Sequence, residues 1–173
     1  FQLVQLLVAV PFAVIRYCLI PYLYSEFLKA ALRDDMMFKP LGFDFPADHM
    51  AKETEDQLLI GDELMIAPVY KQNARGRYVY LPEEMMLVRM QTWDQIHTEI
   101  LPKGHHYVDI ALEELVFFIR RQKAIPFGRP AQNTDCIDHS ALQLLGYPGC
   151  TYELYADNGI SPEPETSLSI TTL

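Results

Sequence analysis

The chain has 173 residues, of which 50% are hydrophobic and 12% aromatic, so it can bury a sizeable core within about one domain. This composition excludes disordered and low-complexity proteins. The 14 basic and 23 acidic residues give a net charge of −9. Such a surface repels phosphate groups, which argues against nucleic acid and anionic membranes as partners but not against neutral molecules such as sugars.

The cysteine content points to a reducing compartment. The three cysteines, Cys18, Cys136 and Cys150, form no disulfide framework, because an odd count leaves at least one thiol unpaired. The sequence also lacks Cys/His zinc spacing, an N-x-S/T glycosylation sequon and a glycine-rich phosphate loop. We therefore expect a cytoplasmic location, with no metal and no cofactor.

The first predicted element is a long helix. Its apolar run, residues 1–15, is shorter than the roughly 20 residues that cross a bilayer, and no basic segment precedes it as in a signal peptide. We therefore expect a buried helix whose partner need not lie in this chain. The apolar stripe that follows has helical spacing and consists of Ile20, Leu23, Tyr24, Phe27, Leu28 and Ala31.

Polar side chains mark the opposite side of this helix, and prolines interrupt it. Four polar positions lie off the stripe: Ser25, Glu26, Lys29 and Arg33. Pro11 and Pro21 are expected to break or kink the helix, because proline lacks the N–H and clashes with the preceding turn. Asp34-Asp35 is expected to mark its end.

A short strand and a second helix are predicted next. Residues 36–46 read as a strand that ends at Pro46, and its centre is 38–43. Asp48 can cap a helix over 49–59, which ends near Gly61. Helix, strand and helix in succession are typical of an α/β unit.

After Gly61 the pattern changes to short strands separated by turn residues every 8–14 positions, which favours an antiparallel β-sandwich. The predicted strands are 64–69, 78–81, 87–90, 107–110, 117–120, 141–145 and 151–155. The tail 161–173 begins with a linker-like Ser-Pro-Glu-Pro-Glu run and ends in a candidate edge strand, 168–172. The fold class is therefore an α+β fragment.

Six motifs in order resemble those of glycoside hydrolase family 31, the α-glucosidases and α-xylosidases, with a bacterial α-glucosidase as the nearest type. The matching segments are Arg16–Tyr24 (RYCLIPYLY), Pro40–Pro46 (PLGFDFP), Gln57–Gly61 with Leu64–Val69 (QLLIG, LMIAPV), Tyr78–Pro82, Phe117–Pro126 and Leu154–Gly159. The sequence departs from the family at three positions. Val116 replaces a proline, Gln122 a glycine and Asn158 an aspartate. If position 122 needs a positive φ, glutamine is strained there by about 1 kcal/mol.

The resemblance implies a domain layout. Residues 1–60 would be the last helices and strand of a (β/α)₈ barrel, 61–160 the proximal C-terminal β-sandwich, and 161–173 a tail or the start of a following segment. The parent would be a retaining α-glucosidase that hydrolyses terminal α-linked glucose. Its two catalytic aspartates would lie on earlier barrel strands, so no catalytic residue is assigned here and the chain is expected to be inactive alone.

The partner implied is the rest of the catalytic barrel. Cut from it, the apolar first helix is expected either to mediate self-association or to pack onto the sandwich edge. The alternative function is a non-catalytic carbohydrate-binding or interaction β-sandwich. Because barrel active sites lie at the carboxyl ends of the strands, we expect the exit of strand 38–43 to border the sugar pocket, with Phe43 and Asp44 as candidate substrate neighbours.

Other residues with catalytic or metal-binding side chains have simpler interpretations. Trp93-Asp94 matches only a fragment of the family's nucleophile motif. His105-His106 with Asp109 could suggest a metal, but consecutive strand residues face opposite ways. Asp157-Asn158-Gly159 lacks the later glutamate of a calcium loop. Adjacent carboxylates are expected in solvated turns: Asp34-Asp35, Asp62-Glu63, Glu83-Glu84 and Glu113-Glu114.

Overall fold

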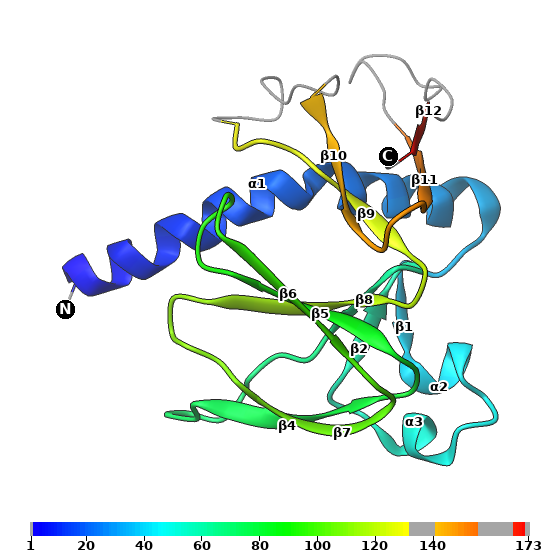
Figure 1. Cartoon of the computed structure of the whole chain (residues 1–173), viewed down its shortest axis with the longest axis horizontal. Helices are drawn as coiled ribbons and strands as arrows, with labels where there is room; N and C mark the ends of the chain where they lie inside the picture. Colours follow the sequence, from blue (N-terminus) through cyan, green and yellow to red (C-terminus); the bar gives the residue numbers. More distant parts are fainter. Residues whose placement is uncertain (1, 132–140, 156–167, 172–173) are drawn as a thin grey trace.

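A computed structural model describes residues 2–131, 141–155 and 168–171. A single long helix, α1 (Gln2–Arg33), runs across a set of antiparallel sheets, and two short helices, α2 (Leu41–Asp44) and α3 (His49–Glu53), lie at one edge (Figure 1). None of the described helices combines the length and the apolar character needed to cross a bilayer.

The largest sheet has six strands in the order β1-β2-β3-β8-β5-β6. Their bounds are β1 Phe38–Pro40, β2 Leu58–Ile60, β3 Leu64–Ile66, β8 Leu115–Arg120, β5 Met85–Met90 and β6 Ile96–Leu101. Every pairing is antiparallel. This confirms the prediction for the strands after Gly61, whereas β1, expected to be the last barrel strand, and β2, expected to be helical, join the same antiparallel sheet. The strands before Gly61, β1 and β2, and those after it, β3, β8, β5 and β6, therefore belong to one sheet.

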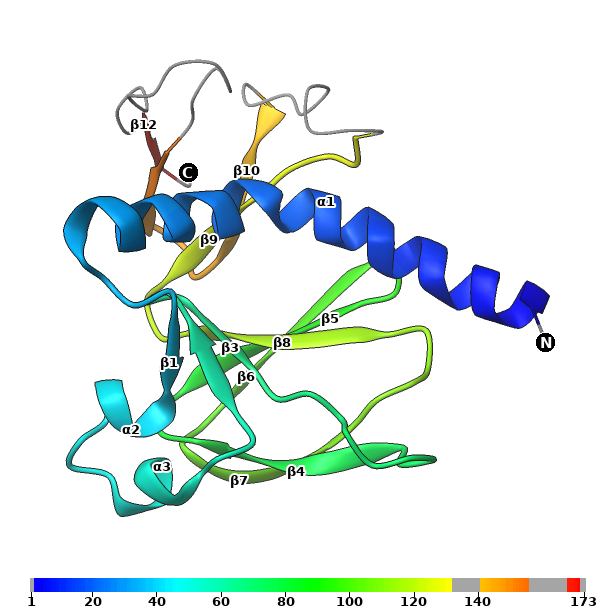
Figure 2. The same ribbon diagram turned by 180° about the vertical axis from the view of Figure 1, so that it is seen from behind.

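Two further layers cover the faces of this sheet (Figures 1 and 2). On one face lies the ladder of β4 (Gly76–Leu81) and β7 (Gly104–Asp109). On the other lie α1 and two small ladders, β9 (Ala124–Phe127) with β10 (Gln143–Gly146) and β11 (Thr151–Leu154) with β12 (Leu168–Thr171). The expected edge strand near the C-terminus is confirmed.

The central sheet is apolar on both faces because each faces a core. One core combines α1 with the sheet and β9, through Ile15, Cys18, Tyr22, Val88, Ile119 and Ile125 among others. The other lies between the sheet and the β4–β7 ladder, and includes Met65, Leu87, Phe118, Val79 and Val108. This explains why β5 and β8 read as nearly continuous apolar runs rather than alternating ones.

The predicted helix at 49–59 is correct at its start and wrong at its end. The Asp48 carboxylate caps α3 by accepting hydrogen bonds from the amides of Met50 (3.1 Å) and Ala51 (3.3 Å). The helix stops at Glu53, because the Gln57 side chain makes two 2.7 Å hydrogen bonds to the backbone of Tyr80. Residues 58–60 then form β2, between β1 and β3.

The strand predicted over 36–46 is also shorter than expected. Only Phe38–Pro40 forms β1, and Leu41–Asp44 turns into α2, closed by a hydrogen bond from the Phe45 amide to the Leu41 carbonyl (3.1 Å). After Gly61 each predicted strand in the described residues is present, with ends shifted by a few residues. Sequence reasoning missed β6 and β9. Cys136 and the segment Asp157–Gly159 lie outside the described residues.

The long helix differs from the expectations in two ways. It is continuous from Gln2 to Arg33, so of the break or kink expected at Pro11 and Pro21 the break is excluded. Proline at 21 removes the helical donor to the Tyr17 carbonyl. The next carbonyl, that of Cys18, accepts a hydrogen bond from outside the helix, from the Gly128 amide (3.0 Å). The buried face is also not the predicted stripe, because Phe27 is exposed whereas Ser25 and Glu26 are buried. Asp34, with a φ of 58°, lies just after the helix end, as predicted.

Gln122 occupies the turn between β8 and β9 with a φ of 56°, so the position does need left-handed backbone. A non-glycine residue is strained there by about 1–2 kcal/mol. We expect Gln122→Gly to raise the free energy of unfolding by about 0.5–1 kcal/mol, since part of the gain is offset by the greater freedom of glycine in the unfolded chain. Urea unfolding measures this, and an unchanged or lower midpoint would contradict it.

Candidate functional site

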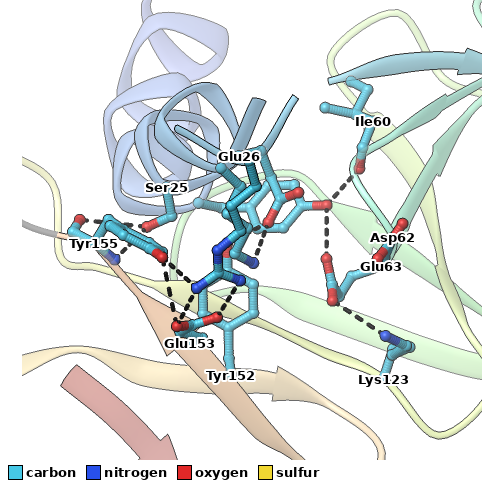
Figure 3. Close-up of polar contacts among 12 residues, drawn as sticks. Ser25, Glu26, Ile60, Asp62, Glu63, Lys123, Tyr152, Glu153 and Tyr155 are labelled. Carbon is cyan, nitrogen blue, oxygen red and sulfur yellow. Dashed lines mark hydrogen bonds and ion pairs between the residues drawn. The ribbon is translucent and has the colours of Figure 1, made fainter. Parts of the chain in front are cut away.

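A polar cluster joins α1 to the sheets, and we call it the helix–sheet junction (Figure 3). Its α1 residues are Tyr22, Ser25, Glu26, Lys29 and Arg33, whose spacing places them on one helical face. Its partners are the Ile60 carbonyl, Glu63, Lys123, Tyr152, Glu153 and Tyr155. Segments up to 130 positions apart thus meet along about three turns of helix.

Tyr22 and Glu63 form the deepest part of the junction. The Tyr22 hydroxyl donates to the Ile60 carbonyl and lies 3.4 Å from Glu63 Oε2. Glu63 Oε1 pairs with Lys123 Nζ at 3.3 Å. Burial, followed by the charge of Glu26, raises the pKa of Glu63 above its ordinary value. Burial also raises the pKa of Tyr22, so this phenol stays a donor.

In the second part of the junction, Glu26 binds Tyr152 and Lys29. Its Oε1 accepts from the Tyr152 hydroxyl and pairs with Lys29 Nζ, both at 2.6 Å. The Lys29 ammonium also lies 4.1 Å from the centre of the Tyr152 ring, where the ring face attracts a cation. The pKa of Tyr152 is raised by burial and by the Glu26 charge. Each group therefore has a partner, and the Lys29 and Glu26 side chains are only 14% and 6% exposed.

The third part lies at the end of α1. The Ser25 hydroxyl donates to the Pro21 carbonyl (2.7 Å) and accepts from the Tyr155 amide (3.0 Å). About two turns later Arg33 makes two parallel bonds to Glu153, at 2.6 and 2.8 Å, and contacts the Tyr155 hydroxyl. The hydrogen bond from Arg33 lowers the pKa of Glu153.

This arrangement suits mechanical support better than proton transfer. Retaining glycosidases need two carboxyl groups about 5–5.5 Å apart, one free to attack and one free to exchange a proton. In the junction Glu26, Glu63 and Glu153 are each paired with a lysine or arginine. Glu26 and Glu153 fasten α1 to β11, and Glu63 links Tyr22 of α1 to Lys123 of the β8–β9 turn.

The candidate substrate neighbours Phe43 and Asp44 take different positions. Asp44 Oδ2 pairs with Arg120 (2.6 Å) and Lys39 (3.2 Å), and Arg120 also binds Glu83 (2.8 Å). Asp44 thus links two of the family-like segments, PLGFDFP and the one containing Arg120. The Phe43 ring is exposed and borders a hollow of about 160 Å³ between α1 and the β2–β3 turn, beside Glu26, Lys39 and Asp62. Their proximity to sugar stays a prediction.

The other candidates are separated in space. The His105 ring lies 4.9 Å from that of Tyr80, whereas His106 Nε2 contacts the Pro102 carbonyl at 2.7 Å. Asp109 pairs with Arg89 instead (3.1 Å). Within the described residues no three metal-ligating side chains come together. Trp93 and Asp94 lie in the β5–β6 turn beside a hollow of about 270 Å³.

Sequence reasoning missed the junction because it placed Ser25, Glu26 and Lys29 on the solvent side of α1. A usable signal was present: Tyr22, Ser25, Glu26, Lys29 and Arg33 follow i, i+3, i+4, i+7 and i+11. Polar groups that share a helical face with apolar Ile15 and Cys18 point to a buried polar network.

Comparison with known proteins agrees with these motifs. The sequence model "Glycosyl hydrolase family 31 C-terminal domain" matches residues 34–125. Alpha-glucosidase 2 of Bacillus thermoamyloliquefaciens is 30% identical over 150 residues, which are 84% of this chain and 18% of that protein. An alpha-glucosidase of Schizosaccharomyces pombe is 28% identical over 162 residues, 90% of this chain and 16% of that protein.

A solved structure shows the same fold. The GH31 alpha-xylosidase of Xanthomonas citri matches with a TM-score of 0.68 and 26% identity over 84% of this chain and 16% of that one. The chain therefore spans less than a fifth of the length of each of these three relatives. These findings place the match at the C-terminal domain of glycosidases. The chain belongs to glycosyl hydrolase family 31, and its mixed helix and antiparallel-sheet structure corresponds to the C-terminal domain of that family.

Proposed function

We propose that this chain is the C-terminal structural portion of a retaining α-glucosidase that hydrolyses terminal α-linked glucose. Residues 1–60 would form the terminal piece of the catalytic (β/α)₈ barrel, with β1 and β2 joining it to the antiparallel sheet, and the sheets after Gly61 would brace it. The alpha-glucosidases of Bacillus and Schizosaccharomyces support the substrate class. The catalytic aspartates would belong to earlier barrel strands, so the chain is expected to be inactive alone. Its expected cytoplasmic location stays a prediction.

The observation that carries the proposal is a set of large apolar side chains that nothing covers in the segment assigned to the barrel. Phe27, Leu32 and Phe43 have exposed fractions of 56%, 55% and 60%. Met36 and Phe38 of the same segment are also exposed. The first turns of α1 project past the sheets in both views (Figures 1 and 2). Exposed apolar surface of this kind marks an interface, and the missing barrel would cover it.

In the isolated chain this surface should cause self-association. We expect light scattering to give a mass above that of the monomer, rising with protein concentration. Phe27→Ser combined with Leu32→Ser should return the mass to that of the monomer, because both side chains lie in the proposed interface. Leu112→Ser is the matched control, since Leu112 is 72% exposed but lies in the β7–β8 connection, and it should change nothing.

A clean monomer that binds no hydrophobic dye would contradict the proposed interface. Equal effects of the α1 double variant and the Leu112 variant would contradict it too, since apolar exposure anywhere would then be enough.

The second candidate, a carbohydrate-binding β-sandwich, is favoured by a specific feature. Exposed aromatic rings gather on the outer face of the β4–β7 ladder. This ladder lies on the opposite side of the central sheet from α1 (Figure 1). The two functions are compatible, because the ladder and the α1 surface lie on different layers.

A further inference from the structure

Tyrosine rings lie side by side on the outer face of the β4–β7 ladder. Tyr78 is directly opposite Tyr107 in the register, and their ring centroids are 5.2 Å apart in an edge-to-face arrangement. Alternate residues of a strand share a face. The inner face carries Val79 and Val108, which pack into the second core, so Tyr78 and Tyr107 must point outward.

A third tyrosine joins them from the segment between β3 and β4. The Tyr70 ring lies 5.6 Å from the Arg77 guanidinium, and its hydroxyl donates to Asp56 Oδ2 at 3.4 Å. Arg77 is fixed in turn by an ion pair with Asp56 and by a 2.8 Å bond to the Pro68 carbonyl. Tyr70 is thus held in place from two sides rather than left free in solvent.

These three residues, Tyr70, Tyr78 and Tyr107, form what we call the tyrosine platform. Their exposed fractions are 67%, 71% and 58%. Together with Lys71 and Arg77 they border a hollow of about 300 Å³, which is at the lower end of the range for small-molecule sites. Large rings are rarely left this exposed in a group without a binding role.

The chemistry of the platform favours a neutral, ring-shaped polar ligand. Tyrosine offers an apolar face that can stack and a hydroxyl that can hydrogen-bond, and Lys71 adds donors at the rim. Arg77 and Asp56 neutralise one another, which leaves Lys71 at the exposed rim as the remaining charge of the lining, while the three rings supply the larger contact surface. A stable protein contact would need about 800 Å² on each side, far more than three rings beside a small hollow provide.

We propose that the tyrosine platform binds a neutral saccharide, and specifically a short α-glucan chain. The choice of the α-linkage rests on the proposed function, whereas the stacking of sugar rings on the platform does not. The platform is separated from the helix–sheet junction by the whole thickness of the central sheet (Figure 2), so binding there is independent of support by α1.

The test is calorimetric titration of the 173-residue chain with maltoheptaose. We expect saturable binding that weakens at least about tenfold in Tyr78→Ala and in Tyr107→Ala, as for the central aromatic residues of a binding surface. Tyr78→Phe keeps the stacking face and should keep most of the affinity. Because both side chains are exposed, the alanine variants should unfold at the wild-type temperature.

Trp93→Ala is the matched control, since it removes an exposed aromatic ring from the β5–β6 turn instead. The proposal that the tyrosine platform binds saccharide would be contradicted by the absence of saturable binding. It would also be contradicted if binding were lost in Trp93→Ala but kept in the tyrosine variants. Equally tight binding of cellohexaose would overturn the α-glucan assignment and leave the platform standing. Since the readout is binding, none of these results bears on whether the chain is the supporting part of an enzyme.

Discussion

Replacing Gly61 by alanine should lower the free energy of unfolding by about 3 kcal/mol, as the sum of backbone strain and a steric clash. Gly61 has a φ of 63°, and its amide donates to the Met37 carbonyl at 2.7 Å. A Cβ there would lie 2.1 Å from Glu26 Oε2. That carboxylate cannot move aside freely, because Lys29 and Tyr152 hold it.

Gly149 provides the matched control. It also has a positive φ, of 75°, but a Cβ built on it meets no atom within 4 Å. Gly149→Ala should therefore cost only the backbone strain, about 1 kcal/mol. Chemical denaturation of both variants measures the difference. Equal costs at 61 and 149 would contradict the tight contact between the β2–β3 turn and α1.

Replacing Glu26 by leucine should cost about 3–5 kcal/mol, because it leaves the Lys29 charge and the Tyr152 hydroxyl without their partner in a buried place. The side chains of Lys29 and Glu26 are only 14% and 6% exposed. Urea unfolding followed by circular dichroism measures the loss. Tyr152→Phe in the same background should then cost little, because the hydroxyl it removes has already lost its acceptor.

Glu153→Leu is the control within the same junction. It removes the partner of Arg33, but these side chains are 37% and 45% exposed, so water replaces the lost interaction. The expected cost is below about 1 kcal/mol. If the two substitutions cost the same, the junction would not depend on burial in the way the structure indicates.

The elements that could be predicted from the sequence are those whose local chemistry agrees with their tertiary setting. Asp48 precedes a helix and caps it as expected. The run at Leu115–Arg120 is apolar and β-branched or aromatic enough to read as a buried strand. Two of the family motifs also meet in the structure, because Asp44 of one forms an ion pair with Arg120 of the other.

The failures have physical causes. Leu58–Ile60 is a three-residue apolar run, which fits a helix and a strand equally well until Gln57 is seen to bond Tyr80. β6 was missed because it is an edge strand whose side chains are largely exposed, so no apolar alternation marks it. The buried face of α1 was misplaced because burial of Glu26 requires Lys29 and Tyr152, and Tyr152 lies 126 residues away.

The same limit applies to the sites. The junction and the tyrosine platform are both assembled from distant segments, and neither has a contiguous motif. Tyr70 joins Tyr78 and Tyr107 only through the path of the chain between β3 and β4 and the pairing of β4 with β7. The composition gives the number of tyrosines, but it does not reveal that three of them border the same exposed hollow.

The most direct test of the proposed supporting role is turnover of an aryl α-glucoside by the purified 173-residue chain, with the Bacillus alpha-glucosidase as the positive control. We predict no turnover above a buffer blank, because the carboxylates of the helix–sheet junction are engaged in bracing α1. Turnover that is clearly above the blank, and that disappears in Glu26→Gln or Glu63→Gln, would show instead that this chain carries its own catalytic pair.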